Sequence, residues 1–405
     1  MNANGRFTSS LATGDLIFII QVQGVKVKGW KENDVWQHGR PMDETYGRIL
    51  DYQSCGLNEF AQVRSVPNAT TIELNCDLVN DYITDGDTTE VVVVRVPRCN
   101  SLTVNASASI TCESWNGQTG GIVAIEVFND AIINGNIDVS AKGFRGGEAL
   151  LTSFDWNIPQ YGSPSTDDGA EKGESIYGYR AEYNITKSGF YCRGAIANGG
   201  GGGNATNCGG GGGSNAGDTA LWTGYGVPSL DVPNWANAWN LELPGLATSV
   251  SSGGGKGGYS YSGENMDALT VPPGDLSWGG QYRFPYGGFG GRPLDYTTGR
   301  LFFGGGGGAG DQNDYDGGDG GNGGGLITIM VYGNVSGSGT LNANGERGGN
   351  AIGGTPSLNG RTGIDGAGGG GGGGTIVVNA IGTICLLYTS PSPRDRTRSR
   401  MPSSA

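Results

Sequence analysis

The chain is short of the side chains that most catalytic centres use. Its only histidine is His38, so mechanisms that need two histidine ligands, or a histidine with a second imidazole, are excluded. We find no convincing HExxH, GxSxG or Ser-x-x-Lys motif. None of the seven cysteines forms a CxxC pair, so the usual spacing of zinc ligands is absent. The chain therefore has few of the side chains and motifs from which the familiar catalytic sites are built.

Positive charge and long apolar runs are also scarce. Lys and Arg number 25 against 38 Asp and Glu, which gives a net charge of −13. This balance argues against nucleic acid and anionic lipid as partners, because both bind through clustered Lys and Arg. The longest apolar stretch, Leu16 to Val22, has the length of a strand and not of a membrane helix. Sugars, metal ions and other proteins remain as partners.

Glycine, in contrast, is abundant. It supplies 81 of the 405 residues, whereas its usual share is about 7%. Hydrophobic residues make up only 36% of the chain, and they are clustered. Any hydrophobic core must therefore be local.

Residues 1–115 have the pattern of short strands joined by turns. Asp15–Gln23 is apolar and β-branched, Thr70–Asn75 alternates, and Glu90–Val96 is a nearly continuous valine run. Such a run is typical of a strand that is covered on both faces. These patterns predict an N-terminal β region without a convincing amphipathic helix.

After residue 115 a repeated unit appears. A glycine pair precedes an alternating apolar strand, a turn, a second short strand and a Gly-x-x-Gly-Gly motif. The unit begins at Gly120-Gly121, again at Gly324-Gly325, and a third time at Gly373-Gly374. Such units cannot bury a face alone, so we expect them to stack. Residues 116–384 are therefore predicted to form an all-β, right-handed β-helix-like solenoid, with 148–322 as a long insertion.

The insertion holds four long glycine runs: Gly199–Gly203, Gly209–Gly213, Gly253–Gly255 and Gly304–Gly308. Glycine runs are usually flexible linkers, but linkers are mixed with Ser and free of bulky residues. These runs alternate with aromatic residues, so we favour ordered segments in an extended or polyproline-II-like helix with three residues per turn. That helix has no internal hydrogen bonds, and its N–H and C=O groups must pair with neighbouring segments.

The aromatic residues of the insertion have two interpretations. Either they pack flat on glycine surfaces, which we favour, or an exposed subset stacks on sugar rings. The candidates for glycan stacking are Trp222, Trp235, Trp239, Trp278 and Tyr282.

An acidic stretch at 311–322 is the candidate metal site. Hard oxygen ligands lie beside glycines that permit tight turns, as in calcium loops. The candidate ligands are Asp311, Asn313, Asp314, Asp316 and Asp319. The stretch partly resembles the calcium-binding nonapeptide repeat, although it has Asn322 in place of an Asp and occurs once. An acidic solvated loop is the alternative, and no other cofactor is expected.

Six cysteines precede residue 385. An even number is typical of disulfides in an oxidising compartment. Neighbours in the sequence suggest the pairs Cys55–Cys76, Cys99–Cys112 and Cys192–Cys208. Six reduced thiols are the alternative.

Residues 385–405 differ sharply in composition from the rest of the chain. Glycine vanishes, and Arg394, Arg396, Arg398 and Arg400 alternate with small polar residues. A basic tail for an acidic partner is one interpretation. The stretch resembles a translated sequencing-library adapter, and we favour a non-native tail that fold reasoning should leave out.

Several motifs in a fixed order resemble a known family. They are residues 14–24, 115–123, 143–147, 197–204 and 301–310. They look like segments of very large, glycine-rich exported proteins of gliding, type-nine-secreting bacteria, including proteins labelled as adventurous gliding motility proteins. The resemblance covers residues 5–384. It implies surface display, with a role in adhesion or motility, and it supplies no catalytic residues.

Together these features favour an extracellular or cell-surface structural or adhesive module. We expect shallow, multivalent contacts with glycans, surface polymers or partner proteins, and no catalysis. No signal peptide begins at Met1, so we expect that the natural N-terminus lies further upstream. The alternative is a polysaccharide-active β-helix enzyme that uses clustered aspartates, such as Asp167-Asp168 or Asp314 with Asp316. A mechanical spacer without a ligand is a third interpretation.

Overall fold

The computed structural model describes most of the chain. The described residues are 7, 9–29, 46–84, 88–150, 161–165, 168–185, 189–204, 208–215, 287–312, 317–350 and 365–386. Within them the protein is all-β, and the single helix is the six-residue α1 (Arg180–Ile185). No helix in this part of the chain is long and apolar enough to cross a membrane.

The N-terminal region forms an antiparallel sheet. Its strands are β1 (Leu16–Gln23), β4 (Asn58–Asn68), β5 (Thr71–Leu74) and β6 (Glu90–Val96), in the order β5-β4-β1-β6. Two shorter strands, β2 (Lys26–Val27) and β3 (Ile49–Asp51), pair separately. The three strands expected from the sequence are confirmed.

The strand covered completely on both faces is β1. All eight residues of β1 are buried, because β4 and β6 flank it and both of its faces are packed. The valine run in β6 lies at the edge of the sheet: Val92 and Val96 are buried in one core and Val91 packs on the opposite one, but Val93 is 49% exposed. The expectation for the valine run is therefore confirmed only in part. An uninterrupted apolar run indicates a strand but does not give its position in the sheet.

Three parallel sheets follow. The first has the order β16-β13-β10-β7, the second β17-β14-β11-β8, and the third β15-β12-β9. The strands of the first are β7 (Arg98–Cys99), β10 (Ile122–Val127), β13 (Leu326–Val331) and β16 (Thr375–Ala380). Those of the second are β8 (Leu102–Val104), β11 (Ala131–Ile133), β14 (Val335–Gly337) and β17 (Ile384–Leu386). Those of the third are β9 (Ser109–Ile110), β12 (Asn136–Asp138) and β15 (Thr340–Asn342).

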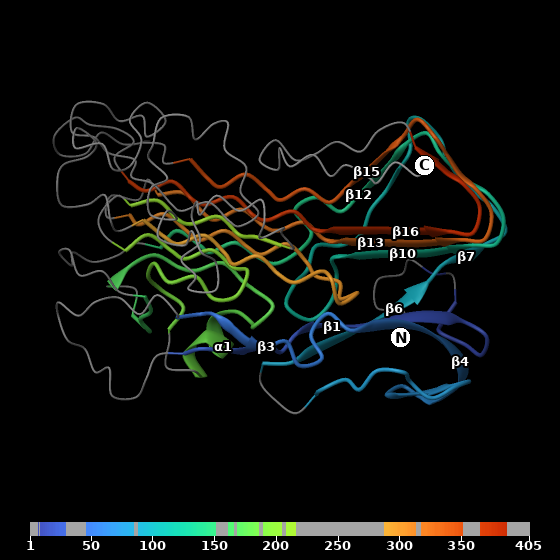
Figure 1. Ribbon diagram of the computed structural model, residues 1–405, viewed down its shortest axis with the longest axis horizontal. Coiled ribbons are helices and arrows are strands. Elements are labelled where there is room, and N and C mark those ends of the chain that lie inside the picture. Colours follow the sequence, from blue (N-terminus) through green and yellow to red (C-terminus); the bar gives the residue numbers. More distant parts are fainter. Residues whose placement is uncertain are drawn as a thin grey trace.

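Consecutive strands therefore form layers that stack in register (Figure 1). Layer 1 is β7–β9, layer 2 is β10–β12, layer 3 is β13–β15, and layer 4 contains β16 and β17. Ile122 pairs with Leu326, and Leu326 pairs with Thr375. The three repeats recognised in the sequence thus align strand for strand.

Two boundaries differ from those expected. Layer 1 lies within residues 1–115, yet it pairs with the strands of the glycine-rich region. Strand β17 includes Cys385, which pairs with Ser336, although the tail was expected to begin at that residue. The parallel sheets thus extend beyond both expected limits.

An apolar core fills the space between the three sheets. Layers 2 and 3 each contribute side chains from all three of their strands. The buried members include Val123, Ala131 and Ile137 of layer 2 and Ile327 and Leu341 of layer 3. The alternation of the strands explains this pattern, because every second side chain points to the same face.

The glycine runs form a bundle of extended segments next to these sheets (Figure 1). Segment 304–311 lies at its centre, and its N–H groups point to three neighbours in turn. Gly304, Gly307 and Gly310 donate to carbonyls in segment 318–324. The next residue of each triplet donates to segment 208–214, and the third donates to segment 171–174. The direction of the N–H groups thus repeats every three residues.

The carbonyl groups of the same segment accept from three other neighbours. These are segments 144–147, 200–203 and 366–372, again in steps of three residues. None of the glycines in 304–311 has a positive φ. This is the expected polyproline-II-like conformation, with all hydrogen bonds made between segments. The prediction of ordered, mutually bonded glycine runs is confirmed for these residues.

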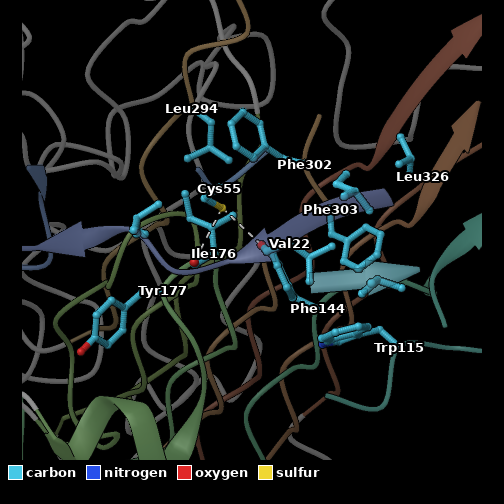
Figure 2. Packing of buried hydrophobic residues seen from close by; sticks show 14 of the residues in the cluster. Val22, Cys55, Trp115, Phe144, Ile176, Tyr177, Leu294, Phe302, Phe303 and Leu326 are labelled. Carbon is cyan, nitrogen blue, oxygen red and sulfur yellow. Dashed lines mark hydrogen bonds between the residues drawn. The ribbon is translucent and has the colours of Figure 1, made fainter. Parts of the chain in front are cut away.

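A second core joins the N-terminal sheet to the parallel sheets and the glycine bundle (Figure 2). Trp115, Phe144 and Phe303 form a cluster with ring centroids 5.3 to 6.3 Å apart. Buried Glu174 lies beside it and accepts hydrogen bonds from Trp115 Nε1 at 2.9 Å and from Gln23 Nε2 at 3.1 Å. It also forms an ion pair with Arg145. The three regions therefore share one interior.

Candidate functional site

An exposed column of large apolar side chains marks one corner of the layers. Phe128, Tyr332 and Ile381 directly follow β10, β13 and β16, and their side chains are 42%, 47% and 77% exposed. The N–H of Tyr332 donates to the carbonyl of Val127 at 2.9 Å, and that of Ile381 donates to Val331 at 3.0 Å. The three residues therefore occupy equivalent positions in successive layers. We call them, together with Arg98 and Glu126, the aromatic corner.

The two rings of the corner stack on each other. The Phe128 and Tyr332 centroids are 5.9 Å apart, and their planes differ by 16°. Arg98 Cζ lies 5.1 Å from the centroid of Phe128. Such stacking of aromatic rings and of a cation on a ring stabilises their positions. The exposed parts of the rings are thus held in a fixed orientation.

The buried carboxylate of Glu126 contacts two other residues of the aromatic corner. Glu126 forms an ion pair with Arg98, and the hydroxyl of Tyr332 donates to Glu126 Oε1 at 3.2 Å. The charge of Glu126 raises the pKa of Tyr332, so this phenol stays protonated and keeps its hydrogen bond. The Arg98 side chain is 30% exposed, whereas that of Glu126 is 4% exposed. The guanidinium is therefore the charged group that the corner presents to solvent.

A ladder of polar side chains lies next to the corner. Asn334 donates from its backbone N–H and its side-chain amide to Asp130 Oδ1, at 2.7 and 3.2 Å. Thr383 donates to Asn334 Oδ1 from its N–H and its hydroxyl, both at 3.0 Å. This ladder fixes the turns that follow the corner residues. It also places further hydrogen-bonding groups beside an apolar surface.

This arrangement suits an amphiphilic ligand. A sugar ring has a C–H face that stacks on an aromatic side chain and hydroxyl groups that bond to planar polar groups. The corner offers two exposed rings and a guanidinium, and the ladder beside it adds the amide of Asn334 and the hydroxyl of Thr383. A polymer that lies along the layers would contact the same position of each layer in turn.

The structure describes only Asp311 and Asp319 of the five expected calcium ligands, so the calcium site stays a prediction. Asp319 Oδ1 accepts a hydrogen bond from the Ala149 N–H at 2.6 Å, and Asp311 is buried at 3% exposure. Asn313, Asp314 and Asp316 lie outside the described residues. Among the residues that are described, no group of three His, Cys, Asp or Glu side chains could hold a metal ion.

The aromatic residues proposed for glycan stacking lie outside the described part of the chain. They are Trp222, Trp235, Trp239, Trp278 and Tyr282. His38 and Asp167 also lie outside it, whereas Asp168 accepts a hydrogen bond from the Ser163 hydroxyl. The expectation of exposed glycan-binding aromatics at these five positions therefore stays a prediction.

The cysteines form no disulfide in the structure, in contrast to the three expected pairs. Cys55 is fully buried, and its thiol donates to the Val22 carbonyl at 3.4 Å (Figure 2), whereas its expected partner Cys76 is exposed. Proximity in the sequence therefore did not place the two thiols in one environment.

The other two expected pairs likewise form no disulfide. The Cys99 thiol donates to the Glu126 carbonyl at 3.7 Å, while Cys112 is buried in the core between the parallel sheets. The Cys192 thiol donates to the Asp168 carbonyl at 3.2 Å, and burial raises its pKa, which disfavours the reactive thiolate. Cys208 is likewise buried.

The sequence contains a signal for the aromatic corner in the spacing of its repeats. Phe128 and Tyr332 each stand one residue after the alternating strand of a repeat. In a stacked repeat, equivalent positions lie above one another. Aligning the repeats position by position therefore predicts that the rings of Phe128 and Tyr332 lie close together.

Comparisons with known proteins add no relative. No family model, no curated protein and no solved structure matches this chain.

Proposed function

We propose that this protein is an extracellular or cell-surface adhesive module that binds glycans at the aromatic corner. The supporting observation is the pair of stacked, half-exposed rings at equivalent positions of adjacent layers, with Arg98 beside them. Shallow contacts that recur from layer to layer suit a polymeric ligand, because several weak contacts on one chain add through a high effective concentration.

We propose further that the layers form a β-solenoid, as the repeats predicted. In-register parallel pairing of three or four strands in each sheet supports this architecture. The glycine bundle would then be a rigid support attached to the solenoid. The extracellular location rests on the resemblance to exported surface proteins and on the acidic, glycine-rich composition.

A glycan array probed with the full chain tests the proposed function. The chain should bind a subset of polysaccharides, and the double variant Phe128→Ala with Tyr332→Ala should lose about tenfold or more in affinity, because each stacking ring contributes about 1 kcal/mol. Tyr296→Ala is the matched control, since Tyr296 is 52% exposed but lies outside the corner.

Two outcomes would count against the proposal. One is that the full chain retains no glycan on the array. The other is that the double variant binds as well as the wild type while its thermal unfolding is unchanged. Release of reducing sugar from bound polysaccharide would instead favour the enzyme interpretation.

A further inference from the structure

Several asparagines of the chain stand in the acceptor motif for N-linked glycosylation, Asn-x-Ser/Thr with x other than proline. They are Asn68, Asn105, Asn184, Asn204 and Asn334. A motif of three residues identifies candidates and not sites. An acceptor in a folded protein must also lie at the surface and keep its side-chain Nδ2 available, because this nitrogen forms the bond to the sugar. The motif of Asn184 ends at Thr186, which lies outside the described residues.

Two of the asparagines use Nδ2 inside the fold. Asn204 is only 3% exposed, and its Nδ2 donates to the Asp168 carbonyl at 2.8 Å. Asn334 is exposed, but its Nδ2 donates to Asp130 Oδ1 at 3.2 Å as part of the polar ladder. Glycosylation of either residue would break a hydrogen bond of the folded chain. Both are therefore poor acceptors in the native state.

Asn68 lies at the exposed end of the β4–β5 hairpin. It pairs with Thr71 across the two-residue turn Ala69-Thr70, and every residue from Pro67 to Thr71 is exposed. Asn68 Oδ1 accepts two hydrogen bonds from Thr70, one from its N–H and one from its hydroxyl, both at 2.9 Å. Asn68 Nδ2 makes no hydrogen bond within the described part of the chain. The nitrogen that would receive a sugar thus faces solvent without a partner to lose.

This arrangement prepares the side-chain amide for reaction. Hydrogen-bond donors on Oδ1 draw electron density from Nδ2 through the amide resonance, so a proton leaves Nδ2 more easily. The hydroxyl that defines the motif already lies on the carbonyl of Asn68. Strand pairing on both sides of the turn holds this geometry, so less order must be imposed when the hairpin enters an active site.

We propose that Asn68 is a site of N-linked glycosylation. The donor class is an oligosaccharide joined through a diphosphate to a polyprenyl lipid, and the catalyst is an asparagine-specific glycosyltransferase. Asn68 Nδ2 bonds to the anomeric carbon of the first sugar, and the bond from that carbon to the diphosphate oxygen breaks. The lipid diphosphate leaves with the electron pair, and the amide gives one proton to the enzyme. The inference rests on the proposed extracellular location, because such enzymes act on exported chains.

Glycosylation of the folded full chain in vitro tests this inference. The unmodified chain is incubated with a purified asparagine glycosyltransferase and a lipid-diphosphate-linked oligosaccharide, and peptide mass spectrometry locates the sugar. We expect one oligosaccharide on Asn68 and none on Asn204, although both begin the same triplet Asn-Ala-Thr. Thr70→Val should abolish transfer to Asn68 because it removes the hydroxyl, whereas Thr70→Ser should retain it.

Asn105 provides the matched control. It is exposed between β8 and β9, but its side chain makes no hydrogen bond to Ser107 in the described structure. Ser107→Thr gives the two exposed motifs the same residue types. Asn68 should then react about tenfold faster than Asn105, the order of factor that a preformed hydrogen bond contributes. A synthetic Asn-Ala-Thr peptide in the same reaction shows that the enzyme is active.

Three results would overturn the proposal when the enzyme is active. One is that Asn68 receives no sugar. The others are equal rates at Asn68 and Asn105 in the Ser107→Thr chain and equal transfer to Asn204 in the folded chain, since the motif and not the geometry would then decide. Binding of the unmodified chain to the glycan array is a separate measurement, so a failure of glycosylation leaves the proposed function standing.

Discussion

Individual glycines are necessary for the packing of the glycine bundle. They are needed because neighbouring backbone atoms approach closely, and not because their φ angles are positive. A Cβ atom on Gly306 would lie 1.8 Å from the carbonyl oxygen of Arg145, and one on Gly308 would lie 2.0 Å from that of Gly201. Both obstacles are backbone atoms, which a rotamer change cannot move. Neither glycine has a positive φ. At these positions the absent side chain itself permits the packing.

Gly306→Ala should therefore destabilise the protein by about 3 kcal/mol or more, because the neighbouring segment must shift to admit a methyl group. Gly299→Ala is the control. Gly299 has no atom within 4 Å of its Cβ position, and its φ of +73° should cost only about 1–2 kcal/mol. Denaturant unfolding of both variants measures the difference. Equal losses for the two substitutions would show that close packing is not the cause.

Lys172 is a charged group inside the same region. It is fully buried, and its Nζ donates to the carbonyls of Tyr161 and Cys192 at 2.7 and 2.8 Å and also to that of Tyr191. The ring of Tyr46 lies 5.7 Å from Nζ. Burial lowers the pKa of Lys172 to about 7 from its ordinary value of 10.5. The ammonium thus links the segment of Tyr161 to the segment of Tyr191 and Cys192, although removing its charge from water costs free energy.

This pKa predicts a pH dependence of stability. Between about pH 7 and 10.5 the unfolded chain binds more protons at this lysine than the folded chain does, so the contribution of Lys172 to the free energy of unfolding rises with pH across that window. Below pH 7 both states are protonated, and the cost of burial is constant. In the variant Lys172→Met this rise should disappear. Urea unfolding at several pH values, compared between the two proteins, checks it, and parallel curves would contradict the assignment.

At the scale of elements, two kinds of extended chain share one interior. Strands of the parallel sheets bond to two neighbours and place every second side chain in a core. Glycine segments have a three-residue period, so one segment bonds to six neighbours, as 304–311 does. The second kind needs no hydrophobic side chains, because its N–H and C=O groups are satisfied between segments. This explains how an ordered region forms with so few apolar residues.

The amide protons of segment 304–310 should therefore exchange slowly with solvent. Each of these N–H groups donates to a buried carbonyl, and the segment itself is buried from Phe303 to Gly310. We expect protection close to that of β10 and β13, since opening one glycine segment breaks bonds to six others. Hydrogen exchange followed by mass spectrometry on peptides from both regions measures this. Exchange of 304–310 at the rate of an unfolded peptide would refute the packed bundle.

At the scale of the whole molecule, the N-terminal sheet, the parallel sheets and the glycine bundle form one body. The aromatic cluster of Trp115, Phe144 and Phe303 lies where they meet, and Glu174 binds residues from all three. A division of the chain at residue 115 therefore separates segments that share a core. The aromatic corner lies at the surface of this single body.

The sequence by itself determined the local features. Alternating apolar residues predicted the main strands, recurrence of the glycine pair predicted which strands align, and glycine runs among aromatics predicted a three-residue period with bonds between segments. These local features follow from backbone geometry. That geometry is set over a few residues, so it can be recognised from the pattern of residue types along the sequence. The predicted calcium ligands and the five aromatics predicted to stack on glycans lie partly or wholly outside the described residues, so both stay predictions.

Tertiary structure alone decided which surfaces and contacts result. Cys55 and Cys76 are near in sequence, but one lies in a core and the other at the surface, so proximity along the chain did not pair them. Phe128 and Tyr332 are far apart in sequence, yet the stacking of layers brings their rings to 5.9 Å. Burial and long-range neighbours depend on how distant segments pack, and no short stretch of sequence contains that information.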